Sequence, residues 1–146
     1  MGILHSFAAE GAADKIARQI KYKNGASELR TTDEYGFMPI HHAAANGCIE
    51  TIKVLLEAGS PVDGRTRGGD EERTPLMLAA IKGNLAAAKH LVAAGANVNA
   101  EDEDTMTPLA FACHSKQKEI AEFLLQSGAQ KTDHWGVVDW LTQVGL

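Results

Sequence analysis

Three segments of this chain share one pattern, and their spacing constrains the fold more than any other feature. The pattern reads Met-Pro-Ile-His-His-Ala-Ala at 38–44, Thr-Pro-Leu-Met-Leu-Ala-Ala at 74–80 and Thr-Pro-Leu-Ala-Phe-Ala-Cys at 107–113. The prolines lie 36 and then 33 residues apart, and the same two intervals separate Gly59, Gly95 and Gly128. A fixed period in this range is typical of stacked supersecondary units. Such a stack offers a long concave surface rather than one enclosed pocket.

Each unit predicts two short helices joined by a turn. Thr74 and Thr107 can cap a first helix, because a hydroxyl there accepts from the free N–H groups of the first turn. Pro follows at the position where its missing N–H costs nothing. The second helices carry apolar residues three and four apart, which is the spacing of one helical face: Ile49, Ile52, Leu55 and Leu56, then Leu85, Ala88, Leu91 and Val92, then Ile120, Phe123 and Leu124. The repeated glycines stand where a left-handed residue ends a helix.

These signals coincide in phase three times, and the pattern resembles the ankyrin repeat. Residues 73–102, RTPLMLAAIKGNLAAAKHLVAAGANVNAED, are close to that family's consensus. The resemblance implies an all-α solenoid of helix-turn-helix units with projecting β-hairpin loops, forming one domain over 1–146. We expect an N-terminal capping repeat at 1–32, repeats at 33–69, 70–101 and 102–132, and a partial C-terminal cap at 133–146.

The chain departs from the family pattern at several places. The loop at 64–73 is three residues longer, and such insertions often mark the binding face of a repeat protein, although a mobile surface loop is the alternative. Thr105 and Lys116 stand where the family usually places Gly, so we expect strained or reshaped turns there. Residues 137–144 predict one short helix without a following partner. This end is either a half-repeat cap or the edge of a fragment of a longer protein.

Charge and hydropathy exclude several classes of function. The net charge is -5, and it is divided unevenly: residues 1–32 carry five basic and three acidic residues, whereas 33–146 carry nine basic and sixteen acidic ones. Nonspecific nucleic-acid binding needs a basic stripe that displaces counterions, so we expect no nucleic-acid partner. No apolar run approaches the roughly 20 residues that span a bilayer. The N-terminus lacks the features of a secretory signal.

The two cysteines, Cys48 and Cys113, indicate no disulfide framework. Cys113 replaces the second Ala of an Ala-Ala pair, so we expect a small buried thiol. Unpaired cysteines favour a reducing compartment. We therefore expect a cytoplasmic monomer, with the nucleus as the alternative location.

No arrangement of side chains predicts catalysis, a metal site or a cofactor. The phosphate-binding loop, the hydrolase nucleophile elbow, the zinc-protease motif and the dinucleotide fingerprint are all absent from the sequence. His41 and His42 diverge by about 100° on a helix, so they do not share a metal easily. His41 falls where the family has a histidine that supports turns by hydrogen bonding. Cys113 and His114 are adjacent and lack an orienting third group. We predict a protein that is not an enzyme.

The resemblance implies that loop tips and the exposed side of the first helices contact a partner protein. Several candidates are apolar at positions expected to be exposed, and aromatic and Met side chains are enriched in interface cores. Packing of Phe37 or Trp135 against the adjacent loop is the alternative. The candidates are Glu34, Tyr35, Phe37, Asn46, Arg73, Ile81, Lys82, Glu103, Asp104, Met106, His114, Ser115, His134 and Trp135.

The acidic run at 101–104 lies on a loop tip. It is either a solvated loop or a means of steering a basic partner, an effect that salt would weaken. With the apolar candidates, it predicts a partner with an apolar ridge flanked by Lys or Arg.

The predicted function is an interaction module, an adaptor or an inhibitor, that binds another protein through its concave groove. One alternative is a regulatory module cut from a larger enzyme or channel. Another is a membrane-associated adaptor, because Met-Gly-Ile-Leu-His-Ser at the start satisfies the N-myristoylation pattern. Membrane contact is expected only if Gly2 is acylated, and the basic helix around Lys15 would then supply a second signal. A ligand or nucleotide sensor is a third alternative, which the acidic loops disfavour.

Overall fold

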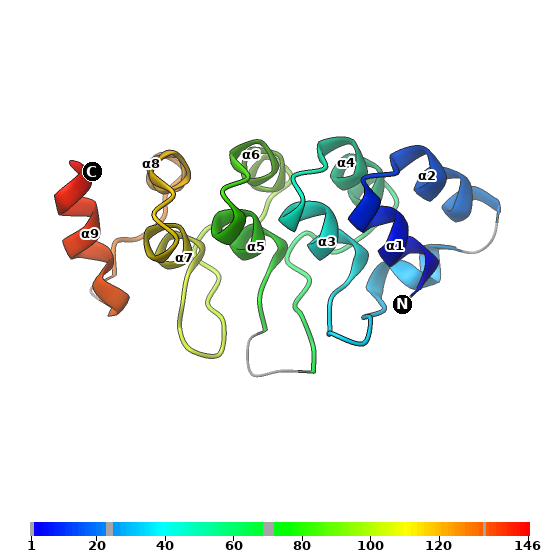
Figure 1. Cartoon of the computed structure of the whole chain (residues 1–146), viewed down its shortest axis with the longest axis horizontal. Helices are drawn as coiled ribbons and strands as arrows, with labels where there is room; N and C mark the ends of the chain where they lie inside the picture. Colours follow the sequence, from blue (N-terminus) through cyan, green and yellow to red (C-terminus); the bar gives the residue numbers. More distant parts are fainter. Residues whose placement is uncertain (1, 23–24, 69–71, 133) are drawn as a thin grey trace.

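The protein is a stack of helix pairs arranged in two rows (Figure 1). The computed structural model describes residues 2–22, 25–68, 72–132 and 134–146, excluding the side chains of Tyr22, Ala26 and His134. The inner row, from which long loops project, consists of α1 (Ile3–Glu10), α3 (Pro39–Ala45), α5 (Pro75–Lys82), α7 (Pro108–His114) and, packed on α7, α9 (Val137–Val144). The outer row consists of α2 (Ala13–Tyr22), α4 (Ile49–Glu57), α6 (Leu85–Ala93) and α8 (Lys118–Gln126). Two short 3-10 helices, η1 (Gly25–Arg30) and η2 (His134–Gly136), lie before α3 and α9. This architecture confirms the predicted all-α solenoid.

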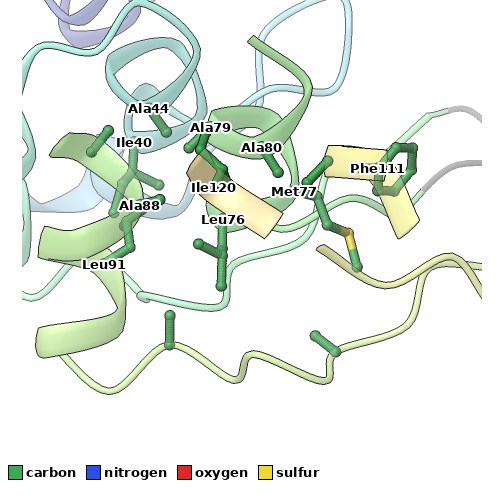
Figure 2. Packing of buried hydrophobic residues seen from close by; sticks show 14 of the residues in the cluster. Ile40, Ala44, Leu76, Met77, Ala79, Ala80, Ala88, Leu91, Phe111 and Ile120 are labelled. Atoms are coloured by element: carbon green, nitrogen blue, oxygen red, sulfur yellow. The ribbon is translucent and has the colours of Figure 1, made fainter. Parts of the chain in front are cut away.

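The inner helices α3, α5 and α7 are each packed between two inner neighbours. Helix α5 packs against α3 on one side, α7 on the other and α6 behind. As a result Leu76, Met77, Ala79 and Ala80 have no exposed surface, and Figure 2 shows them among side chains from adjacent units. Small side chains at the inner positions let the helix axes approach closely, and burial of the large ones supplies most of the stabilisation. Stacking, rather than any single unit, makes the core.

The first turns of the inner helices are capped in two ways. Thr74 Oγ1 accepts from Met77 N at 3.4 Å, and Thr107 Oγ1 accepts from Ala110 N at 3.2 Å, which confirms the predicted threonine caps. Helix α3 has Met38 at this position, and Met38 makes no side-chain cap. The Met38 N–H instead donates to His41 Nδ1 at 3.0 Å. A histidine one turn along therefore satisfies a group that the helix leaves free.

The predicted left-handed positions are confirmed. Gly59, Gly95 and Gly128 have φ of 95°, 93° and 94° just after the outer helices. Thr105 and Lys116, which replace the usual glycines, are held at φ of 62° and 58°. A side chain in this region costs roughly 1–2 kcal/mol, and the branched Thr105 fits it worst.

The projecting loops are not β-hairpins, because no strand is assigned within the described ranges. Single backbone bonds close them: Asp33 N donates to Phe37 O at 2.9 Å, Thr66 N to Arg73 O at 3.0 Å and Asp102 N to Met106 O at 3.1 Å. Three residues of the long loop, 69–71, lie outside the described residues. The first two loops are joined by a bond from Arg67 N to Gly36 O at 2.9 Å.

Gly36 and Gly95 offer a matched test of how the loops support the stack. Both have positive φ, but a Cβ on Gly36 would overlap the Arg67 carbonyl, whereas one on Gly95 would meet nothing within 4 Å. Gly95→Ala should lower the free energy of unfolding by about 1 kcal/mol from backbone strain alone. Gly36→Ala should lower the free energy of unfolding by at least about 2 kcal/mol more than Gly95→Ala does, because the two loops must separate. Urea denaturation would measure both, and equal losses would contradict the loop contact.

Thr105→Gly should stabilise the protein. The change removes the strain of a branched residue at φ 62°, while the freer unfolded chain offsets part of that gain. The expected net increase in the free energy of unfolding is up to about 1 kcal/mol. Thr142→Gly, placed inside α9, is the control and should destabilise by about as much. A lower melting temperature for Thr105→Gly would show that the threonine is unstrained.

Candidate protein-binding surface

The predicted contact residues divide into two sets. Glu34, Tyr35, Asn46, Lys82, Glu103, Asp104, His114 and Trp135 are exposed. Phe37, Arg73, Ile81, Met106 and Ser115 are partly buried, and the side chain of His134 lies outside the described residues. The exposed set contains two large aromatic side chains, Tyr35 at 68% and Trp135 at 57% exposed.

A buried carboxylate shapes the tip that carries Tyr35. Asp33 Oδ1 accepts from Tyr35 N and Phe37 N, both at 3.0 Å, and its Oδ2 lies 2.7 Å from His42 Nε2. Burial opposes ionisation of Asp33, but the three hydrogen bonds outweigh it and hold the pKa of the carboxyl below its usual value. The tip is thereby fixed by its own side-chain-to-backbone bonds, as in an Asx turn.

Asp102 builds the tip of the third loop in the same way. Its Oδ1 accepts from Asp104 N at 3.0 Å and Met106 N at 2.8 Å, and the residue is only 8% exposed. The acidic run at 101–104 is therefore only in part a solvated cluster. Asp102 is structural, whereas Glu103 and Asp104 face solvent.

His41 joins α3 to the long loop of the next unit. Its Nε2–H reaches Gly64 O at 2.9 Å and Arg73 O at 3.1 Å, while its Nδ1 accepts from Met38 N. Because Nδ1 accepts, the proton must be on Nε2 and the ring must be neutral. Burial lowers the pKa of His41 to about 4. His41 therefore has the structural role expected of it, and no freedom to serve as a ligand.

Several apolar candidates are engaged within the protein. The Phe37 ring packs on His41 and His42, with centroids 6.1 and 5.6 Å apart. Ile81 and Met106 are partly buried against the core. Phe37, Ile81 and Met106 therefore offer a partner only part of their surface, and Tyr35 and Trp135 are the exposed aromatic candidates.

Two polar candidates also make internal contacts. The Arg73 guanidinium lies 5.0 Å from the centre of the Phe111 ring, a cation–π contact between neighbouring units. Asn46 Nδ2 donates to Ala9 O at 2.8 Å and so links α3 to α1. Both side chains therefore help to hold adjacent units together.

An acidic cleft of about 510 Å³ lies between the second and third loops. Its lining includes Glu72, Glu101 and Glu103 and one cation, Arg65. The Arg65 guanidinium donates to the backbone carbonyls of Glu72 at 3.0 Å and Glu101 at 2.7 Å. Arg65 therefore ties the two loops together.

The described residues suit recognition better than chemistry. No three His, Cys, Asp or Glu side chains among them converge as a metal site requires. Burial raises the pKa of the Cys113 thiol to about 11, which leaves it unreactive near neutral pH. None of the described helices is both long enough and apolar enough to cross a membrane.

Comparison with known families agrees with the stack of helix pairs. Residues 60–134 match the family described as ankyrin repeats (3 copies), and residues 35–67 match the single ankyrin repeat. The chain belongs to the ankyrin-repeat family. Ankyrin-repeat domains are non-catalytic modules that generally bind other proteins.

Curated ankyrin-repeat relatives are diverse. The chain is 30% identical over 122 residues to Alpha-latrotoxin-Lg1a of Latrodectus geometricus. It is 32% identical over 131 residues to the probable E3 ubiquitin-protein ligase XBOS31 of Oryza sativa. It is 41% identical over 112 residues to the transient receptor potential cation channel subfamily A member 1 homolog of Caenorhabditis elegans. These alignments cover 83%, 89% and 77% of this chain, but only 9%, 26% and 8% of the relatives.

Sequence reasoning missed the residues that fix the ankyrin loops. Asp33 and Asp102 each precede a left-handed residue by three positions, a turn signal that could have identified them. Arg65 had no such signal, because its acceptors are backbone carbonyls of two different loops.

The pKa of His41 predicts a pH-dependent stability. His41 is neutral in the folded state down to about pH 4, whereas an unfolded histidine takes up a proton below about pH 6.5. The unfolded state therefore binds more protons in this window, and stability must fall as the pH falls. Between pH 7.5 and 5 the expected loss from His41 is about 2 kcal/mol. Urea denaturation at the two pH values measures it.

His41→Gln supplies the comparison, because it removes the titration and keeps a polar side chain. The variant should lose most of the difference between pH 7.5 and 5. The exposed His114→Gln is the control and should retain it. A wild-type difference that survives in His41→Gln would assign the pH dependence to other groups.

Proposed function

We propose that this chain is an adaptor or inhibitor that binds a partner protein through the surface made by its loop tips and inner helices. The observation that carries the proposal is the exposure of Tyr35, on the loop before α3, and of Trp135, in η2 before α9. Rigid aromatic side chains of this kind dominate binding energy when a partner covers them.

The geometry of the tips supports a preformed site. Asp33 fixes the Tyr35 tip through three hydrogen bonds, and Arg65 joins the second loop to the third. A surface that is ordered before binding loses little conformational entropy when the partner arrives. The family supports the same class of function, since ankyrin repeats are generally protein-binding modules.

A second candidate is a regulatory module of a larger protein. The chain spans only 8 to 26% of the three relatives compared above. One of these relatives is named a cation channel homolog and another a ubiquitin-protein ligase. In that setting the same surface would bind another part of the assembly. The mass of the full-length protein in source material distinguishes the two candidates.

Tyr35→Ala and Trp135→Ala should each weaken partner binding by more than about 1 kcal/mol with little change in melting temperature, because both side chains project into solvent. Ile81→Ala should weaken binding and also destabilise the fold, because Ile81 packs on the core. An affinity pull-down would compare the wild-type protein with the Tyr35→Ala, Trp135→Ala double variant. Isothermal titration with the recovered partner would then measure each single loss.

Gln126→Ala is the matched control. Gln126 is exposed on α8, in the outer row, and its loss should leave partner binding unchanged. If the double variant recovered the same partner as the wild type with the same affinity, the proposed surface would be wrong.

A further inference from the structure

The two exposed aromatic side chains occupy matching positions in the sequence, Tyr35 in the first loop and Trp135 in η2. The sequence reads Asp-Glu-Tyr-Gly at 33–36 and Asp-His-Trp-Gly at 133–136. Tyr35 precedes Gly36 at φ 81°, and Trp135 precedes Gly136 at φ 68°. The aromatic ring thus stands one residue before a left-handed glycine at both places.

Trp135 is held there against its own backbone preference. Its φ is 61°, in the left-handed region that a bulky residue rarely adopts. Trp135 is nevertheless 57% exposed, so less than half of the residue is buried within the chain. Strain combined with exposure is the pattern of a residue retained for contact rather than for folding.

The loops between the two aromatic residues carry carboxylates instead. Asp104 is the residue of the third loop that corresponds to Tyr35, and it is exposed beside Glu103. In the second loop the corresponding Glu71 lies outside the described residues, but Glu72 is half exposed. The row of tips therefore has aromatic ends and an acidic centre.

Within the described ranges, Glu101, Glu103 and Asp104 form no salt bridge with a cation of these loops. Arg65 is directed to two backbone carbonyls and lies 3.8 Å from the carboxylate of Glu72. Arg73 lies over the Phe111 ring. Arg67 is exposed, but its loop segment is bonded to Gly36, towards the Tyr35 end. Glu101, Glu103 and Asp104 remain exposed, so the field over the central tips is negative.

The stack sets the distance between the aromatic ends. The inner helices contact one another in the order α3, α5, α7 and α9, so three packing steps separate the two ends. Packed helices lie about 8–10 Å apart, which gives a span of about 25–30 Å. An extended chain advances about 3.3 Å per residue and crosses that span in about eight or nine residues.

We propose that the row of loop tips binds an extended, basic segment of a partner protein. The segment carries one apolar side chain at each end, and the two apolar residues are about eight or nine residues apart. The Lys and Arg side chains in the middle of the segment face the carboxylates, and the two apolar side chains rest on Tyr35 and Trp135. This segment has basic residues in the middle and apolar residues at the ends, whereas the sequence alone predicts a partner with an apolar middle and basic flanks. The inference rests on the proposed protein-binding function and specifies the occupant of that surface.

Selection of random twelve-residue peptides displayed on phage, with the full chain as bait, tests the inference. The expected enriched sequences have a Lys- and Arg-rich centre and an apolar or aromatic residue near each end. Affinity should fall as salt rises, because the central contacts are between exposed charges. No enrichment, acidic sequences, or sequences with a single apolar anchor would each overturn the inference.

Variants of the chain then locate the bound peptide. A synthetic copy of the enriched peptide should lose at least tenfold in affinity for Tyr35→Ser and for Trp135→Ser. It should lose a similar factor for the charge reversal Glu103→Lys, Asp104→Lys. The control is Glu119→Lys, Glu122→Lys, which makes the same charge change on the outer helix α8 and should lose much less. Circular dichroism melting of every variant confirms that the fold is intact.

Failure of this inference is distinguishable from failure of the proposed function. If the selected peptides ignore the tip variants but are lost in Lys82→Glu, His114→Glu, they occupy the inner helices. That result would overturn the tip-binding segment and leave the protein-binding surface standing. Equal binding by all the variants would overturn both.

Discussion

The structure depends on close contact between successive inner helices. Ala43, Ala44, Ala79, Ala80 and Ala112 have no exposed surface, and each lies where one inner helix meets its neighbours. Side chains this small allow the helices to approach, and the Leu, Ile and Met side chains around them are then sealed from water. A single helix pair has no second wall to complete this burial. Each unit is therefore stable only as part of the stack.

Packing of the inner helices also sets the geometry of the loops. His41 in α3 bonds to backbone carbonyls of the following loop, Gly36 accepts a bond from Arg67, and Arg65 reaches Glu101 of the third loop. Bonds of this kind connect residues about one repeat apart in sequence. A change at one loop therefore affects the next, because the described parts of neighbouring loops are bonded to one another.

The difference between a buried stack and exposed loop tips explains how the same scaffold occurs in proteins as different as a toxin, a ligase and a channel homolog. The buried residues fix the repeat and leave little choice of side chain. Apart from the residues that shape them, such as Asp33 and Gly36, the tips have no such constraint, so their chemistry can follow a partner. In this chain, strain at Trp135 and exposure of Tyr35 lie at the two ends of the row, while carboxylates occupy its centre. The side chains that the scaffold leaves exposed, rather than the scaffold itself, therefore indicate what the protein binds.

The sequence by itself determined the architecture. Period, threonine caps, alanine pairs and left-handed glycines are local signals, because each reports the backbone conformation of a few neighbouring residues. It also placed Thr105 and Lys116 where the family usually has Gly, and the resemblance implied a structural role for His41. Only the tertiary structure decided which surface residues are free. Phe37 and Asp102 lie on loop tips and Ile81 lies in α5, and packing or hydrogen bonds occupy all three, whereas Tyr35 and Trp135 remain available. The physical reason is that availability depends on contacts between units, such as those of Arg65 and His41, and these join residues too far apart in the chain for any local pattern to record.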